Sequence, residues 1–265
     1  MSEKLRYLGP ERTSRDTIDQ LINQLSLKTL ENIEISGLKN IPKTGSFVLG
    51  FLPHSGFMEV PAIDEAIRPI RPPPVWITKE ENTKGIPSAI RGNRRLLFIN
   101  RDSPGPQTIK TALAILAQTQ GIIASSWEGT RFGRKTEDPD DILTLAPAKD
   151  GLTLITTKAG VPIITAVVLG ADQVLPRLDK IYAQGGKWAV VKALYQALNR
   201  KDKPSLTVDF LPPYTDHILP EGTTLIGPQE RAHYAHHTQQ IMKTQAIPAI
   251  LKRNPNYPLG PYANP

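Results

Sequence analysis

The sequence predicts a single α/β domain in which helices cover both faces of a central, mostly parallel mixed sheet. Two observations lead to this prediction: short, nearly continuous apolar runs recur along the chain, and segments with helical periodicity separate them. Continuous apolar runs are typical of strands that are buried on both faces. The strands are expected at residues 46–52, 75–78, 96–100, 121–126, 162–169 and 206–210.

Three segments between and after these strands have the apolar spacing of amphipathic helices. The pattern over residues 108–120 stops at Gly121, and the pattern over residues 152–159 stops at Gly160, as helices commonly do. A third helix is expected at residues 228–251, where it would pack back onto the domain.

The N-terminal part of the chain predicts a further amphipathic helix over residues 13–33. Thr13 and Asp16 have the spacing of a capping box, and aliphatic residues follow at helical intervals. Packing of the apolar face on the main domain is the favoured interpretation, and contact with a membrane surface is the alternative. We therefore expect an N-terminal helical segment (1–36), an α/β domain (37–253) and a loosely ordered tail (254–265).

The composition limits the classes of function. The chain has 265 residues, a formal net charge of +7 and no cysteine, which excludes disulfides and cysteine-ligated metals. A basic balance suits nucleic acid, an anionic membrane surface or a phosphorylated substrate. Only 6% of the residues are aromatic and no nucleic-acid motif is present, so a nucleic-acid partner is disfavoured.

No run in the sequence predicts a transmembrane helix. The longest nearly apolar run, residues 161–171, is far shorter than the roughly 20 residues that a spanning helix needs. The first residues carry charged side chains and lack the apolar core of a secretory signal. We therefore expect a cytoplasmic protein that associates with membranes peripherally.

The first candidate site follows the strand predicted at residues 46–52. His54 stands just after this strand, and Glu59 follows five positions later. If the chain turns from a strand into a helix here, the carboxylate can hold one imidazole nitrogen while the other takes a proton from a hydroxyl. The spacing alone is weak evidence, because a lone histidine at a strand end is more often structural.

Two further polar groups follow other predicted strands, at the edge where sites form in α/β sheets. Arg101 ends the run Phe98-Ile99-Asn100, and its planar guanidinium can bind two phosphate oxygens. In the block Trp127-Glu128-Gly129-Thr130-Arg131, Gly129 would let the backbone approach a ligand and Arg131 could share a phosphate with Arg101. A solvated basic face and a turn with a surface ion pair also explain these residues.

Taken together, four blocks resemble the glycerolipid acyltransferase family, which includes lysophosphatidic acid and glycerol-3-phosphate acyltransferases. Family members carry a histidine with a carboxylate five residues on, an apolar strand ending in arginine, an E-G-T-R block and a V-P-I block. The corresponding blocks here begin at His54, Phe98, Glu128 and Val161, in the same order. The resemblance spans residues 37–169, and its E-G-T-R block matches fully.

This resemblance implies transfer of a fatty acyl group from acyl-CoA or acyl-carrier protein to the hydroxyl of a phosphorylated glycerolipid, 1-acylglycerol-3-phosphate above all. His54 would be the general base, assisted by Glu59, and no acyl-enzyme, metal or further cofactor is implied. The two arginines would anchor the acceptor phosphate, and the Val161 block would shape the site from beneath. The substrate-binding residues implied are Arg101, Glu128, Gly129, Thr130 and Arg131.

Three departures from the family pattern bear on the substrate more than on the reaction. Pro53 precedes the histidine where asparagine is usual, Glu59 replaces the usual aspartate, and Ser126-Trp127 replaces Phe-Pro. Glutamate at this position also occurs in related branches such as the lipid A acyltransferases. The alternatives are the same reaction on another lysolipid or a lipid A-like acceptor, or a non-catalytic lipid- or membrane-binding relative.

A last group of residues, His233, His236 and His237, has the i, i+3, i+4 spacing of metal ligands. The sequence offers no partner ligand, so a solvated helix face is the favoured interpretation.

Overall fold

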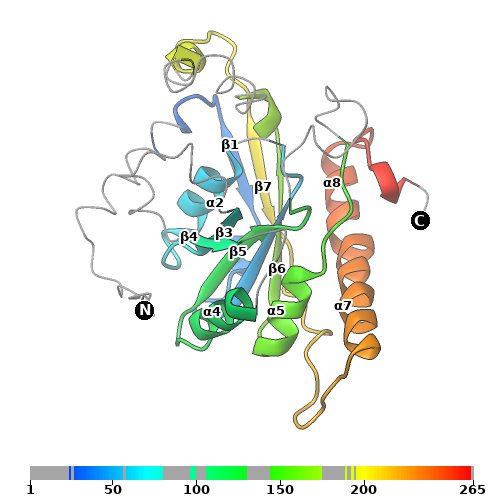
Figure 1. Ribbon diagram of the computed structural model, residues 1–265. Coiled ribbons are helices and arrows are strands. Elements are labelled where there is room, and N and C mark those ends of the chain that lie inside the picture. Colours follow the sequence, from blue (N-terminus) through cyan, green and yellow to red (C-terminus); the bar gives the residue numbers. More distant parts are fainter. Residues whose placement is uncertain are drawn as a thin grey trace.

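The computed structural model contains one seven-stranded sheet with the order β1-β7-β6-β2-β5-β3-β4 (Figure 1). The structure describes residues 24, 27–55, 58–79, 96–99, 106–129, 144–174, 189, 192–193 and 195–263. The strands are β1 (Ile33–Ser36), β2 (Phe47–Leu52), β3 (Val75–Lys79), β4 (Leu96–Ile99), β5 (Ile122–Ser126), β6 (Ile163–Leu169) and β7 (Leu206–Phe210).

The sheet is mixed and mostly parallel, as predicted. Strand β7 pairs antiparallel with β6, and β1 pairs parallel with β7, so these two strands run against the other five. The pairs between β6, β2, β5, β3 and β4 are all parallel. The carboxyl ends of these five strands therefore meet at one edge of the sheet.

The described helices lie on both faces of the sheet (Figure 1). The α-helices are α2 (Glu59–Ile67), α4 (Pro106–Leu116), α5 (Gly151–Ala159), α7 (Pro228–Ile241) and α8 (Ile247–Arg253). A π-helical turn, η4 (Met242–Ala246), joins α7 to α8, and the 3-10 helices are η1 (Leu38–Asn40), η3 (Ala171–Gln173) and η5 (Gly260–Tyr262).

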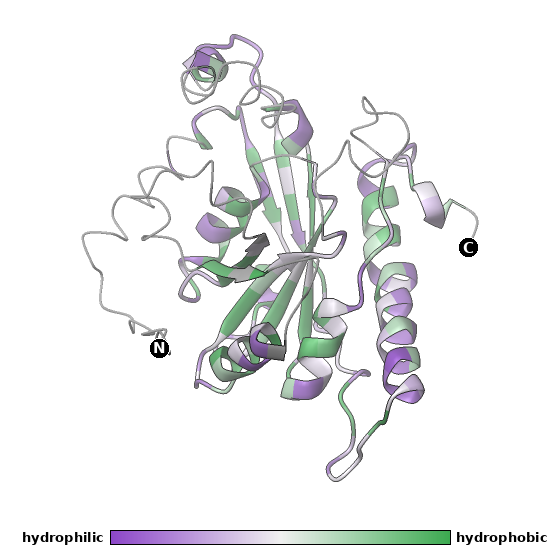
Figure 2. Ribbon diagram, viewed as in Figure 1, coloured by the Kyte–Doolittle hydropathy of each residue, from purple (hydrophilic) through white to green (hydrophobic). Residues whose placement is uncertain are grey.

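Strand β2 shows why helices are needed on both faces. All six of its residues are buried, because successive side chains of a strand point to opposite sides. Phe47, Leu49 and Phe51 belong to the apolar cluster that includes α2. Val48 and Leu52 belong to the cluster that includes α4, α5, α7 and α8. Each such side chain contributes about 1.5–3 kcal/mol when fully buried, and Figure 2 shows the strands as predominantly apolar.

The predicted strands are found within one residue of their expected ends, but several other elements differ from the predictions. Helix α2 and the edge strand β1 were not predicted, since β1 has an intermediate and exposed burial pattern instead of a continuous apolar run. Most of the N-terminal helix predicted at 13–33 lies outside the described residues. The chain is helical at Leu27 and enters β1 by Ile33, so the prediction extended too far.

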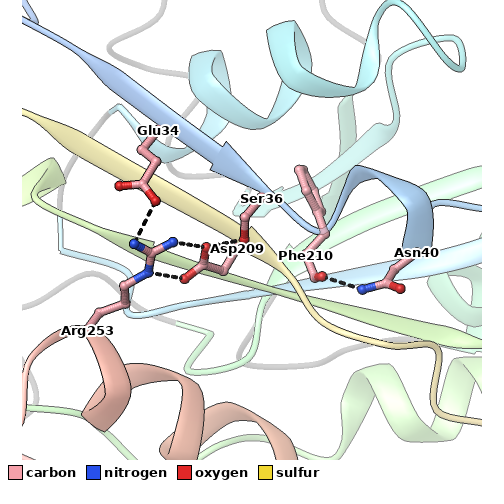
Figure 3. A network of polar contacts seen from close by, with 6 residues as sticks. All are labelled: Glu34, Ser36, Asn40, Asp209, Phe210 and Arg253. Carbon is pink, nitrogen blue, oxygen red and sulfur yellow. Dashed lines mark hydrogen bonds and ion pairs between the residues drawn. The ribbon is translucent and has the colours of Figure 1, made fainter.

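The C-terminal end of α8 is held against the sheet by a polar network (Figure 3). Nε and Nη2 of Arg253 donate to Oδ2 and Oδ1 of Asp209 on β7, each at 2.8 Å. Nη1 of the same residue donates to Glu34 on β1 at 2.7 Å, and the Ser36 hydroxyl donates to Asp209. The bidentate pair thereby joins the C-terminal helix to the two strands that run against the rest of the sheet.

The segment after α8 is attached to the fold at several points, whereas we expected a loosely ordered tail over residues 254–265. The Tyr257 side chain is buried in the cluster of the α5 and α7 face. The carbonyl of Pro258 accepts the N–H of Leu145 at 2.9 Å, and η5 follows directly. Richness in proline and asparagine therefore did not indicate looseness here, because the backbone finds partners across the fold. Residues 264–265 lie outside the described part.

Candidate active site

The candidate site lies where β2 and β5 end. These strands are parallel neighbours with Phe51 opposite Ser126, so the residues that follow them come out at the same edge. His54 follows β2, and Glu128 follows β5. Sites in open α/β sheets commonly form beyond the carboxyl ends of such strands.

His54 and Glu59 come together as their spacing suggested. Nδ1 of His54 lies 3.5 Å from Oε1 of Glu59, the first residue of α2. The same Oε1 accepts the backbone N–H of Ser55 at 2.7 Å, and the start of a helix favours negative charge. Glu59 is fully buried, while 16% of the His54 side chain is exposed. The pair therefore presents a reachable imidazole that is backed by a buried carboxylate.

Aromatic packing limits the orientation of the His54 ring. The Phe51 ring contacts it edge-on with centroids 5.1 Å apart, and Phe51 itself contacts Trp76 in the same manner at 5.7 Å. Nε1 of Trp76 donates to Asp64 on α2 at 2.9 Å. Through these contacts, residues of β2, β3 and α2 hold the aromatic side chain against which the imidazole packs.

Glu128 uses its buried carboxylate to hold two backbone segments. Oε2 accepts the N–H of His54 at 2.6 Å, and Oε1 accepts the N–H of Ala146 at 2.7 Å. Only 2% of Glu128 is exposed, and a buried carboxylate requires such donors. We expected Glu128 to line an acceptor pocket, whereas these two contacts are to the backbone N–H groups of His54 and Ala146.

The residues on either side of Glu128 explain part of the local sequence. Gly129 has φ +68°, in the left-handed region that glycine adopts without strain. Trp127 is fully buried, and its indole lies over Gly50 of β2. A Cβ at position 50 would come within 2.2 Å of Nε1 of Trp127, so the tryptophan requires glycine on the neighbouring strand.

Asp172 is an acidic residue of this region that the sequence did not single out. Asp172 lies in η3, which follows the carboxyl end of β6 next to β2. Burial raises the pKa of Asp172, and the charge of Glu59 raises it further. Its position just after a predicted apolar strand, like that of His54, was the signal that could have identified it.

The remaining predicted residues fall elsewhere. Arg101, Thr130 and Arg131 lie outside the described residues. Val161 precedes β6, so it lies at the amino edge of the parallel strands, opposite His54. Its carbonyl accepts a hydrogen bond from Nε2 of His217 at 3.0 Å.

The histidines at that opposite edge form a cluster rather than a fully solvated face. Nε2 of His233 donates to the carbonyl of His217 at 2.9 Å, and Nδ1 of His237 is hydrogen-bonded to the Tyr214 hydroxyl at 2.6 Å. His217 is fully buried, and burial lowers its pKa to about 4. Within the described ranges, no group of three or more histidine, aspartate or glutamate residues could hold a metal ion.

No protein-family model and no curated protein matches this chain. Among solved structures, the chain is similar to the crystal structure of the 1-acyl-sn-glycerophosphate (LPA) acyltransferase PlsC from Thermotoga maritima. The likeness covers 88% of this chain and 81% of that chain, with 18% sequence identity and a TM-score of 0.49.

In the part of the chain that the structure describes, no helix is both long enough and apolar enough to cross a membrane.

Proposed function

We propose that this chain is an O-acyltransferase that moves a fatty acyl group from an acyl thioester to the hydroxyl of a glycerolipid, with 1-acylglycerol-3-phosphate as the preferred acceptor. The observation that carries the proposal is the pair of His54 and Glu59, with Nδ1 and Oε1 3.5 Å apart at the carboxyl edge of the sheet. The order of the four sequence blocks supports the choice of reaction.

The pair suits general base catalysis in which the substrate supplies the nucleophile. Glu59 faces Nδ1, and Nε2, on the opposite side of the ring, accepts the proton of the acceptor hydroxyl. The hydroxyl oxygen attacks the thioester carbonyl, and a C–O bond forms. The C–S bond then breaks, and the proton held by His54 passes to the departing thiolate. The buried carboxylate stabilises the imidazolium between these steps.

Acyl-CoA or acyl-carrier protein is the donor, and Arg101 and Arg131 bind the acceptor phosphate, because a guanidinium can bind two phosphate oxygens at once. Gly129 and Thr130 line the acceptor site. An anionic membrane surface presents the lipid, in keeping with the net charge of +7.

The decisive experiment measures thiol release from acyl-CoA, and separately from acyl-carrier protein, against lysophosphatidic acid, glycerol-3-phosphate and phosphate-free acceptors. We expect acceptor-dependent release that falls about 10²–10⁴-fold in His54→Gln. His236→Gln is the matched control, because His236 is exposed on α7 and does not belong to the site at the ends of β2 and β5. An active His54→Gln enzyme would remove the general base, and silence across the panel from folded wild-type protein would favour the non-catalytic lipid-binding relative.

Membrane association has its own test. Cosedimentation with anionic vesicles should be lost as salt is raised, and neutral vesicles should bind weakly. Absence of binding to anionic vesicles at low salt would contradict the peripheral assignment while leaving the reaction untouched.

A further inference from the structure

We infer that the C-terminal segment, residues 257–262, positions the active site. It is hydrogen-bonded to the segment 144–149, and that segment is hydrogen-bonded to Glu128. Glu128 in turn accepts the backbone N–H of His54. The catalytic consequence rests on the proposed function, but the positioning of His54 can be measured without it. The C-terminal segment is more than 200 residues from His54 in the chain, so only the fold brings the two into one unit.

The segment 144–149 lies between the C-terminal segment and the end of β5, and its N–H groups are divided between the two sides. The N–H groups of Leu145 and Ala148 donate to the Pro258 carbonyl at 2.9 Å and the Tyr262 hydroxyl at 2.7 Å. The N–H groups of Ala146 and Lys149 donate the other way, to Glu128 at 2.7 Å and to the Trp127 carbonyl at 2.8 Å. Displacement on one side must therefore be felt on the other.

The packing between these two segments is close. Gly260 has φ +55°, and a Cβ at this position would lie 2.4 Å from the carbonyl oxygen of Leu145 and 2.7 Å from the Thr144 side chain. Leu145 is fully buried, so it has little room to yield. Glycine is required at position 260 both by its backbone conformation and by this approach.

Tyr262 links the C-terminal segment to the charge of Glu128. Its hydroxyl accepts the Ala148 N–H, burial raises the pKa of the phenol, and the negative charges of Glu128 and Asp150 raise it further. The hydroxyl thus remains protonated and uncharged. Phenylalanine at this position would keep the ring and lose the hydroxyl that accepts the Ala148 N–H.

The test compares Gly260→Ala with Gly222→Ala. Both glycines have positive φ, +55° and +80°, so alanine is strained at either position. A Cβ at position 222 has no neighbour within 4 Å, so this control carries the backbone strain without the displacement of Leu145. Tyr262→Phe is the second variant, and it keeps the inference testable if Gly260→Ala fails to fold.

The first readout is the backbone amide of His54. The chain has five histidines, so selective ¹⁵N-histidine labelling gives five backbone amide signals, and the His54 signal is assigned by its loss in His54→Gln. We expect Gly260→Ala and Tyr262→Phe to move the His54 amide proton upfield and to speed its exchange, because its hydrogen bond to Glu128 lengthens. The signals of the distant histidines and those of Gly222→Ala should stay in place.

The second readout is thiol release. We expect kcat to fall about tenfold in Gly260→Ala and several-fold in Tyr262→Phe, with KM for the acyl donor nearly unchanged, since small displacements of a catalytic group slow the chemical step. An unmoved His54 amide in both variants would overturn the inference. If wild-type protein released no thiol while the His54 amide still moved, the proposed function would fail and the positioning element would stand.

Discussion

The backbone N–H of His54 donates to Oε2 of Glu128 across 2.6 Å, although 74 positions separate the two residues in the chain. The second carboxylate oxygen accepts the N–H of Ala146, so a single buried side chain joins the ends of β2 and β5 to the segment 144–149. Glu128 therefore fixes the position of the His54 backbone, in addition to any contact it makes with a substrate.

This relationship predicts a strong effect of Glu128→Gln. The amide keeps one oxygen acceptor but places an NH₂ group against one of the two backbone N–H donors, which leaves a buried donor unsatisfied. We expect a loss of about 1–3 kcal/mol in the free energy of unfolding and a fall of about 10²-fold in kcat, measured by urea denaturation and thiol release. Glu221→Gln, at an exposed position, is the control. Full activity in Glu128→Gln would show that the backbone of His54 needs no such anchor.

The space around Gly50 and Gly151 differs, so we expect alanine to have opposite effects on stability at these two positions. In Gly50→Ala the new Cβ would lie 2.2 Å from Nε1 of a fully buried indole, so we expect destabilisation of about 1–3 kcal/mol or more. In Gly151→Ala the Cβ meets nothing within 4 Å at the start of α5, and we expect a gain of about 0.5–1 kcal/mol. Equal midpoints for both variants in thermal unfolding would contradict the close approach of the Trp127 indole to Gly50.

The network in Figure 3 predicts that Arg253→Lys weakens the attachment of α8 to the sheet. A lysine ammonium cannot bind both oxygens of Asp209 and Glu34 together, so we expect a loss of about 1–2 kcal/mol in the free energy of unfolding. Glu34→Gln should cost less than about 0.5 kcal/mol, because Glu34 is half exposed. A larger loss of stability in Glu34→Gln than in Arg253→Lys would contradict the prediction that the contact of Arg253 with Asp209 matters more than its contact with Glu34.

The same network has a defined pH dependence. Burial opposes ionisation of Asp209, but hydrogen bonds from Arg253 and Ser36 and the charge of Arg253 together lower its pKa below the ordinary value of 3.8. A carboxyl whose pKa is lowered by folding stabilises the protein above that value, and the stabilisation is lost as the pH falls through the folded-state pKa.

The burial of His217 predicts a second loss of stability on acidification, at a higher pH than the loss caused by protonation of Asp209. Burial lowers its pKa from 6.5 to about 4, so the unfolded chain binds a proton that the folded chain excludes between these values. Stability should therefore fall as the pH drops from about 6.5 to about 4, by at most about 3 kcal/mol from this residue. When the free energy of unfolding is measured by urea denaturation at several pH values in this range, it should depend less steeply on pH in His217→Gln than in wild type or the exposed control His236→Gln. Identical slopes in all three would contradict the prediction.

Local patterns predicted the strands well, because burial on both faces leaves a continuous apolar run that does not depend on distant residues. The pairing of His54 with Glu59 could also be anticipated, since five positions separate them. Strand β1 and the C-terminal segment were missed or misjudged for the same reason: each is held by partners far away in the chain, Asp209 and Arg253 in one case and Leu145 in the other.

The sequence by itself determined the α/β class, the order of the candidate catalytic blocks and the histidine that leads them, because these depend on residue type and short spacing. Only the tertiary structure decided what Glu128 binds, that the charge of Glu59 acts on Asp172, and that Tyr262 supports the segment beside the site. Strand register and strand order set these contacts. They arise from the packing of the whole sheet, so no short stretch of sequence encodes them.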